Sequence, residues 1–78
     1  RKAECHFFNG TQRIRFLEMN FFDRQELAYF DSDRGKYVAV AELGEPEVKR
    51  LNQDKDALRG EMANVDVFCR NNYEIHAP

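Results

Sequence analysis

The chain has 78 residues and contains no tryptophan, only two cysteines, two histidines and two prolines. Its four glycines are dispersed, so the sequence has no glycine-rich loop of the kind that holds phosphate groups. The histidines lie far apart, and together with the cysteines they lack the spacing of a zinc finger. No convergent set of acid, base and nucleophile is present. These absences argue against an enzyme, and we expect no metal site and no cofactor.

Long apolar runs and a strong excess of one charge are also missing. Hydrophobic residues make up 42% of the chain, which is typical of a globular domain, but no apolar run is long enough to cross a bilayer. The net charge of −2 does not indicate binding to nucleic acid or to a membrane surface. A single domain of this length buries only a small core, so it often needs a covalent link or a partner.

The two cysteines, Cys5 and Cys69, lie near the two ends of the chain. They are either two unrelated buried thiols or one disulfide, and their spacing alone does not decide between these alternatives. A disulfide would stabilise the domain by roughly 4 kcal/mol in the chain-entropy description. Asn9, with Gly10 and Thr11 after it, fits the acceptor pattern for N-glycosylation. Together with a cysteine pair, this pattern favours an oxidising, secretory compartment.

The first half of the chain has the pattern of four strands. Asn9-Gly10 is a strong hairpin signal after the first apolar run, and the cluster at 31–35 is typical of a turn. The longest expected strand alternates between an apolar face that includes Leu17 and a face that mixes aromatic, acidic and amide groups, as a ligand-facing surface would. The expected strands cover residues 4–8, 13–22, 25–30 and 36–41.

The second half of the chain changes to a helical period. The sequence GEPE at 44–47 is typical of a helix start, because proline fits the first turn and acidic residues suit its positive end. Apolar residues then recur at helical spacing, with a gap at Lys55 and a helix-weakening glycine at Gly60. We expect one long helix from about Pro46 to about Asn72 that is bent or broken in places.

Four strands followed by one helix predict a single α+β domain over residues 1–78. Four antiparallel strands span about 20 Å, at roughly 4.8 Å per strand, whereas one helix is about 10 Å across. One helix therefore cannot cover the face of the sheet. The uncovered part must meet a second domain, a ligand or both, and we expect marginal stability without such a partner.

Four segments spread over the whole chain resemble class II MHC β chains. The segments are ECHFFNGT at 4–11, FDSD at 30–33, ELGEP at 42–46 and VDVFCRNNY at 65–73. They resemble, in this order, the first strand with its glycosylated turn, the turn of the third strand, the entry into the helix and the end of the helix. Their spacing fits without gaps, so the four segments are specific together although none would be alone.

The resemblance implies a membrane-distal domain in which an antiparallel four-stranded sheet and one segmented helix form half of a peptide-binding groove. It implies a disulfide between Cys5 and Cys69, a glycan on Asn9, and a class II α chain that supplies the other half. An extended peptide would bind between the two helices for recognition by a T-cell receptor. Invariant chain and a peptide-exchange factor are further implied partners, whereas nucleic acid is not. The implied location is the cell surface and endosomal membranes, on the extracellular or luminal side, with the membrane anchor outside this segment.

The resemblance also implies which residues bond the peptide backbone. Asn72 matches a family asparagine whose amide both donates and accepts. Asn71 and Leu51 stand where the family usually has histidine and tryptophan, which both donate to the peptide. Asn71 can replace one donor with a shorter reach, but leucine cannot donate, so one bond worth roughly 1 kcal/mol is lost. These departures leave open a non-presenting class II-like molecule that acts in peptide exchange. A secreted module that binds a protein through its uncovered sheet is a third alternative.

Further positions match pockets of the family groove. Glu18 and Glu61 would face a central pocket, where two carboxylates favour a peptide lysine or arginine; the alternative is that Glu61 points to solvent. Glu47 matches an acid that often pairs with an α-chain arginine, and His76 would lie near the opposite pocket. The expected lining comprises Ala3, Phe16, Glu18, Asn20, Leu27, Tyr37, Glu47, Leu51, Ala57, Gly60, Glu61, Asn64, Phe68 and His76.

Overall fold

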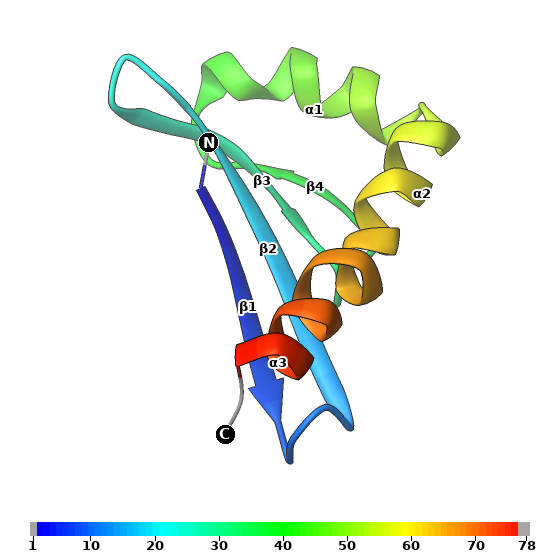
Figure 1. Cartoon of the computed structure of the whole chain (residues 1–78). Helices are drawn as coiled ribbons and strands as arrows, with labels where there is room; N and C mark the ends of the chain where they lie inside the picture. Colours follow the sequence, from blue (N-terminus) through cyan, green and yellow to red (C-terminus); the bar gives the residue numbers. More distant parts are fainter. Residues whose placement is uncertain (1, 77–78) are drawn as a thin grey trace.

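The computed structural model describes residues 2–76, which form a four-stranded sheet with a helical segment across one face (Figure 1). The strands are β1 (Lys2–Phe8), β2 (Arg13–Phe22), β3 (Gln25–Asp31) and β4 (Lys36–Ala39). They pair in the order β1-β2-β3-β4, and each pair of neighbours is antiparallel. The predicted α+β fold, with an antiparallel sheet followed by a segmented helix, is confirmed.

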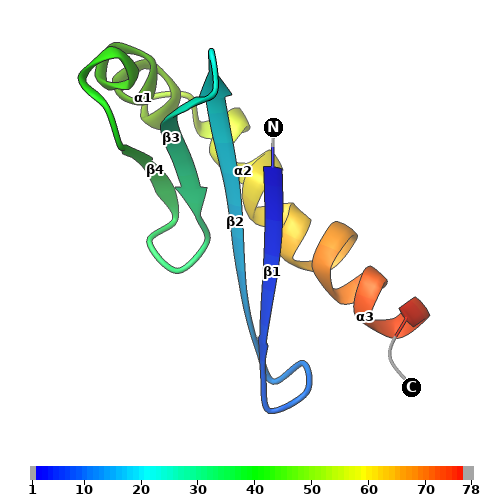
Figure 2. The ribbon, with the colours of Figure 1, turned by 90° about the vertical axis from the view of Figure 1, so that its left-hand side faces the viewer.

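The helical segment is divided into five parts. They are the 3-10 turn η1 (Glu42–Gly44), α1 (Glu45–Asn52), α2 (Lys55–Asn64), the π-helical turn η2 (Val65–Arg70) and α3 (Asn71–His76). The expected gap near Lys55 lies at Asp54, whose side chain accepts hydrogen bonds from two backbone N–H groups and so caps α2. The helical path continues to His76, beyond the expected end near Asn72. Figure 2 shows that the segment runs diagonally from α1 to α3. α1 contacts β4, and the ring of Tyr73 on α3 lies 5.0 Å from that of Phe7 on β1.

The last strand is shorter than expected. β4 ends at Ala39 and not at Ala41, because the N–H groups of Val40 and Ala41 both donate to the carbonyl oxygen of Leu27, at 2.8 and 3.3 Å. The chain then turns into η1 close to β3. A Cβ atom on Gly44 would lie 2.3 Å from that same oxygen, so only glycine fits at the point where the helical segment begins.

The core lies between the sheet and the helical segment, where Val48, Leu51, Leu58 and Val65 pack against the buried cluster. Phe16 on β2, Phe30 on β3 and Cys69 on η2 are at most 1% exposed. The ring of Phe30 lies 6.4 Å from that of Phe16 and meets the ring of Tyr37 edge-on at 5.3 Å. Aromatic pairs of this geometry add to the stabilisation that burial of apolar area provides. The core thus joins three of the four strands to the helix.

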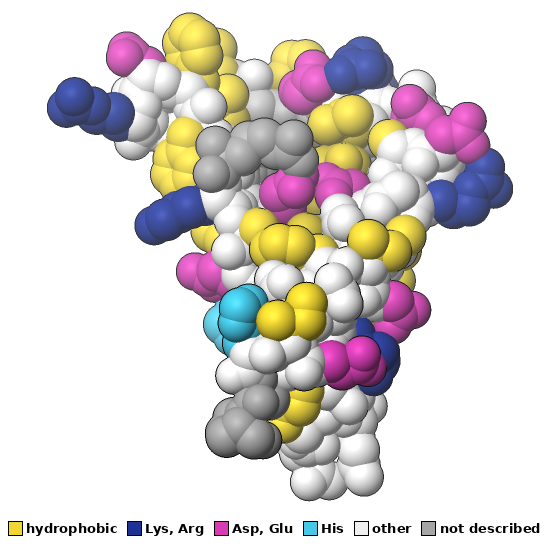
Figure 3. All heavy atoms as spheres, viewed as in Figure 1, with side chains coloured by type: hydrophobic (Ala, Val, Ile, Leu, Met, Phe, Trp, Pro, Cys, Tyr) yellow, Lys and Arg dark blue, Asp and Glu magenta, His cyan; other side chains and the backbone are white. Residues whose placement is uncertain are grey.

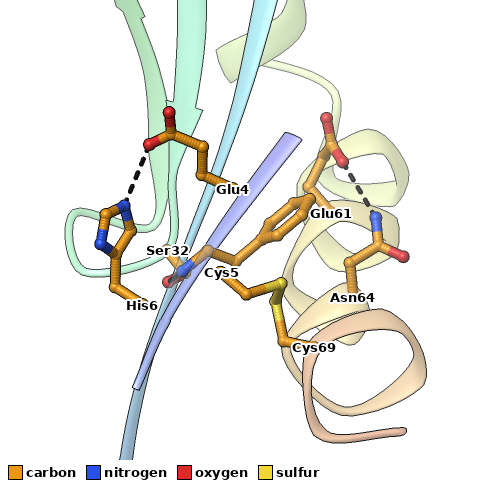
Figure 4. The surroundings of a disulfide bond; sticks show 8 residues. Glu4, Cys5, His6, Ser32, Glu61, Asn64 and Cys69 are labelled. Carbon is orange, nitrogen blue, oxygen red and sulfur yellow. Dashed lines mark hydrogen bonds and ion pairs between the residues drawn. A yellow bond between two sulfur atoms is a disulfide. The ribbon is translucent and has the colours of Figure 1, made fainter. Parts of the chain in front are cut away.

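A disulfide between Cys5 and Cys69 ties the helical segment to the sheet (Figure 4). The two Cα atoms are 5.6 Å apart. Cys69 belongs to the π-helical turn η2 and is fully buried, whereas Cys5 lies on β1 at the edge of the sheet. The structure therefore has one disulfide and not two separate thiols, and it pins the end of the helix over the first strand.

An ion pair between the half-buried Arg15 and the buried Asp31 holds the turn between β3 and β4 against β2. Arg15 donates two hydrogen bonds to Asp31, at 3.1 and 2.7 Å, and the backbone N–H of Asp33 donates a third at 3.0 Å. These donors favour the carboxylate form, and the hydrogen bond from Arg15 is the main reason why the pKa of Asp31 lies below its ordinary value. The hydroxyl of Ser32 accepts from the N–H of Phe16 at 2.8 Å.

Candidate functional site

Two cavities open on the same face of the sheet, beneath the two ends of the helical segment. The first has a volume of about 360 Å³ and lies between α1, α2 and strands β2, β3 and β4. It is lined by Glu18, Asn20, Leu27, Ala28, Tyr37, Gly44, Glu47, Leu51 and Glu61. In Figure 3, acidic side chains surrounded by apolar ones gather between the sheet and the helices. The first cavity thus combines apolar walls with buried carboxyl groups.

The carboxyl group of Glu61 is the centre of this first cavity. Glu61 lies on α2 and is 8% exposed, so it points into the cavity and not to solvent. The hydroxyl of Tyr37 donates to Glu61 Oε2 at 2.9 Å, and the amide of Asn64 donates to Glu61 Oε1 at 3.2 Å. Figure 4 shows the contact with Asn64. Glu18 on β2, which is 9% exposed, shares a further hydrogen bond with Glu61.

Burial and the neighbouring acid change the protonation of Glu61. The pKa of Glu61 is raised to about 7, mainly by burial and in addition by the hydrogen bond and charge of Glu18. The hydrogen bonds from Tyr37 and Asn64 act in the opposite direction, because they stabilise the carboxylate. A carboxyl group of this kind exchanges its proton close to neutral pH. It can therefore present a neutral or an anionic surface to whatever enters the cavity.

The end of α1 is fixed to the edge of the sheet by a single amide. The side chain of Asn52 accepts from the N–H of Tyr37 at 2.8 Å and donates to the carbonyl oxygen of Tyr37 at 3.0 Å. The amide thus takes the place of a neighbouring strand along β4. Because Tyr37 also reaches Glu61, the position of the first cavity wall depends on this pairing.

The second cavity has a volume of about 490 Å³ and lies between β1 and the last turns of the helical segment. It is lined by Ala3, Cys5, Phe7, Phe68, Asn72, Tyr73 and His76. The rings of Phe7 and Tyr73, whose centroids are 5.0 Å apart, pack against each other in its wall. Ala3, which lines the second cavity, pairs directly with Glu18, which lines the first. Directly paired residues point to the same face of a sheet, so both cavities open on one face.

The expected lining residues divide into three groups. The first cavity contains Glu18, Asn20, Leu27, Tyr37, Glu47, Leu51 and Glu61. The second contains Ala3, Phe68, Asn72 and His76. Neither is lined by Phe16, Ala57, Gly60, Asn64 or Asn71.

The residues outside the cavities have different surroundings. Phe16 is a core residue that is 1% exposed, and the ring of Phe68 covers it edge-on at 6.0 Å. Asn64 contacts the cavity only through Glu61. Gly60 and Asn71 are exposed, and nothing lies within 4 Å of a Cβ atom built on Gly60. These exposed helix positions lie open to a further molecule.

Some lining residues were missed by the sequence argument. The sequence could have indicated Ala28, because alternation along β3 places it on the same face as Phe30. Phe7 and Cys5 likewise alternate along β1 with exposed neighbours. The close contact of Gly44 with β3 had no signal, because it depends on where the helical segment meets the sheet. Glu47, which was expected to pair with another chain, forms an ion pair with Arg50 on α1.

Residues 2–76 offer neither a metal centre nor a membrane span. No cluster of three or more histidine, cysteine, aspartate or glutamate side chains in this range could hold a metal ion. No helix within the described part of the chain is both long and apolar enough to cross a bilayer.

The comparison with known proteins identifies the family. Residues 1–77 match the family model for the class II histocompatibility antigen, beta domain. The chain belongs to this family. The family is one of histocompatibility antigens, so the chain does not belong to an enzyme family, as the sequence argument expected. The match also sets aside the alternative of an unrelated secreted module.

Individual class II β chains are similar over nearly all of this β domain. It is 50% identical over 74 residues to the human HLA class II histocompatibility antigen, DRB1 beta chain, which covers 95% of the domain. It is 51% identical over 73 residues to the mouse H-2 class II histocompatibility antigen, E-D beta chain, covering 94%. It is 49% identical over 76 residues to the chicken class II histocompatibility antigen, B-L beta chain, covering 97%. The aligned part is 28%, 28% and 33% of these three relatives, so the chain spans about a third of their length or less.

Proposed function

We propose that the chain forms the β half of a class II groove that binds an extended peptide and presents it to T cells. The observation that carries this proposal is the pair of cavities on one face of the sheet, at the two ends of one helical segment. An extended peptide that follows the helix would send alternate side chains toward the sheet. Two separate side chains of one peptide would then occupy the two cavities.

An α chain is the proposed partner along β1. In the described part of the chain, β1 pairs only with β2 and so leaves its outer edge open. An open strand edge presents unpaired N–H and C=O groups that another strand can bind. A second sheet and helix on that side would cover the face that one helix leaves exposed. We expect the domain to be marginally stable without this partner.

Peptide backbone contacts are proposed for Asn72 and Asn71. Asn72 lines the second cavity, and the exposed Asn71 precedes it at the start of α3. An amide can donate to and accept from an extended peptide in the way that a neighbouring strand would. Leu51 lines the first cavity with an apolar side chain and no donor. The groove would therefore bond the peptide backbone less at the α1 end than at the α3 end.

The first cavity is proposed to take a lysine or arginine of the peptide. Glu18, Glu61 and Glu47 all line it, and none of its lining residues in the described structure is a lysine, arginine or histidine. Acidic groups with little exposure interact strongly with a cation that enters between them. The second cavity, whose lining is mainly apolar and aromatic, would take an apolar side chain.

The proposed setting is the extracellular or luminal side of cell-surface and endosomal membranes, with invariant chain and a peptide-exchange factor as further partners. Asn9 is exposed in the turn between β1 and β2, and its side chain contacts Gln12 at 2.6 Å. An acceptor asparagine in an exposed turn is accessible for N-glycosylation. We propose a glycan there, away from both cavities.

Elution of bound peptides tests the presenting function. The full-length β chain is co-expressed with its α chain, and the purified heterodimer is treated with acid. Mass spectrometry is expected to find nested peptides that share a common core, with lysine or arginine at one fixed core position. An empty eluate from a folded heterodimer would contradict presentation. The lack of a donor at Leu51 would then favour the alternative, a class II-like molecule that acts in peptide exchange.

A further inference from the structure

Two carboxyl groups share one hydrogen-bonded site inside the first cavity. Glu18 comes from β2 and Glu61 from α2, and each is less than a tenth exposed. Two acids in such contact cannot both be ionised without a large electrostatic cost, so the presence of Glu18 favours the protonated form of Glu61. Near neutral pH the pair holds one proton, which agrees with the pKa of about 7 that burial and Glu18 give to Glu61.

The groups that face this pair come from every element around the cavity. From β4, the Tyr37 hydroxyl donates to Glu61, and from α2 the Asn64 amide does the same. α1 contributes Glu47, a third acid, at the exposed rim. β3 contributes Leu27 and Ala28, which do not titrate, and β1 places Ala3 directly opposite Glu18. Within the described cavity lining, ionisable groups other than acids are limited to the tyrosine.

We propose that the Glu18–Glu61 pair is a proton-dependent selector of the peptide side chain that enters the first cavity. The inference rests on the proposed function as a peptide-binding groove and adds a chemical rule to it. With its shared proton, the pair forms a neutral, hydrogen-bonded surface that accepts an uncharged side chain. Without that proton, the pair is a dianion that accepts an ammonium or guanidinium group. Binding of a cationic side chain therefore releases one proton to the solvent.

The direction of the pH effect follows from this exchange. In the empty groove the proton is present below about pH 7, so a cationic side chain must displace it in acid. Its affinity then rises with pH and becomes constant once the pair is already deprotonated. An uncharged peptide side chain that covers the pair stabilises its protonated form. The affinity for such a peptide is therefore constant in acid and falls as the pH rises through about 7. The ratio of the two affinities must increase with pH.

The test compares two peptides that differ only at the residue entering the first cavity. A peptide with a common core, taken from the eluate, is made with lysine or with norleucine at that position. Dissociation constants for both peptides are measured on the αβ heterodimer at several values between about pH 5 and 8. Taking the ratio of the two constants removes every pH effect that both peptides share.

The natural chain is expected to prefer lysine over norleucine by at least tenfold more at about pH 7.5 than at about pH 5.5, since one linked proton permits up to tenfold per pH unit. Glu61→Gln keeps the size of the side chain but cannot exchange the proton, and its single carbonyl oxygen replaces only one of the two oxygens that accept from Tyr37 and Asn64. Its ratio is expected not to vary with pH. Asp56→Asn, which removes an exposed acid elsewhere on α2, is the matched control and should behave as the natural chain does.

The outcomes separate this inference from the proposed function. Peptides that bind with a ratio independent of pH in the natural chain would overturn the proton-dependent selector and leave peptide binding in place. The same pH dependence in Glu61→Gln as in the natural chain would also overturn it. A folded heterodimer that binds neither peptide at any pH would overturn both proposals.

Discussion

Of two buried carboxyl groups in this small domain, one has a basic partner and the other has an acidic partner. Asp31 is 1% exposed and receives two hydrogen bonds from Arg15, whereas Glu61 is 8% exposed and shares its hydrogen bond with a second acid, Glu18. The pKa of Asp31 is lowered mainly by Arg15, and the pKa of Glu61 is raised mainly by burial. Burial alone therefore does not decide the charge of a carboxyl group, because the hydrogen bonds from a cationic partner such as Arg15 can outweigh it.

The location of the two groups explains the difference. Asp31 ends β3 and fixes the turn to β4 against β2, so its charge is balanced within the fold. Glu61 faces a cavity of about 360 Å³, where no cation of the described lining balances it. The charge of Asp31 is thus balanced by Arg15 within the fold, whereas the described lining of the first cavity supplies no lysine, arginine or histidine to Glu61.

The largest expected effect is the loss of the arginine partner. Arg15→Ala would leave Asp31, a carboxyl group that is 1% exposed, without its main partner and should lower stability at neutral pH. Denaturant unfolding of the αβ heterodimer measures this loss. Arg59→Ala, which breaks an exposed ion pair with Asp56 on α2, is the control and should change stability by less than about 0.5 kcal/mol. Equal effects of the two variants would contradict a structural role for Asp31.

The Glu18–Glu61 pair should make the stability of the domain depend on pH in the direction opposite to that of Asp31. The folded pKa of Glu61, about 7, lies above its unfolded value of 4.5, so the folded state keeps a proton that the unfolded state has lost. Stability should fall as the pH rises from about 4.5 to about 7 and then stay constant. Glu61→Gln should remove this slope and stabilise the heterodimer by up to about 3 kcal/mol above pH 7, with little effect at pH 4.5. Unfolding midpoints measured over this range check the sign, and a slope that Glu61→Gln leaves intact would assign it to another group.

Asp31 contributes stability in the other direction. Its folded pKa lies below its ordinary value of 3.8, so its contribution is present at neutral pH and is lost as the pH falls below about 4. Asp31→Asn should therefore weaken the acid-induced loss of stability below about pH 4, whereas Glu61→Gln should not. Acid titration followed by far-ultraviolet circular dichroism distinguishes the two. Identical acid transitions in both variants would contradict the contrast between the two carboxyl groups.

A smaller effect is expected at Ser32, beside Asp31. Ser32→Ala removes the acceptor for the N–H of Phe16 and should cost about 1 kcal/mol of stability. The affinity for peptide should stay the same, because neither cavity is lined by Ser32. Unfolding and peptide-binding measurements on the same sample check both statements. A change in affinity without a change in stability would show that the turn region belongs to the binding site.

The smallest effect concerns the amide that supports the acid pair. Asn64→Ala removes a hydrogen bond that lowers the pKa of Glu61, so the pH at which stability stops falling should move upward by a few tenths of a unit. The stability below pH 4.5 should change by less than about 1 kcal/mol. A downward movement of that pH would contradict the direction of the Asn64 contact.

Much of the fold could be predicted because local patterns determine it. The period of two over 13–22 and the proline and acids at 45–47 agree with β2 and with the start of α1. The gap in the apolar stripe near Lys55 agrees with the break at Asp54. The π-helical turn around Cys69 had no local signal, because it depends on the contact of η2 with β1 and β2.

The candidate site was predicted in part. Seven expected residues line the first cavity, which includes both Glu18 and Glu61, and these came from the family resemblance and not from spacing. The amide of Asn52 that completes the edge of β4 was missed, because one asparagine in a helix carries no pattern. The burial of Phe16 was missed as well, since alternation assigns a face of the sheet but not which helix residue covers it.

Direct titration of Glu61 in the αβ heterodimer tests the central claim, that the first cavity is a ligand site governed by its acid pair. Carbon-13 NMR of labelled glutamate carboxyl groups, assigned with Glu61→Gln, follows this group without and with the lysine peptide. The account predicts a midpoint near pH 7 in the empty groove and a clearly lower midpoint when the peptide is bound. A midpoint near 4.5 that the peptide does not change would contradict it.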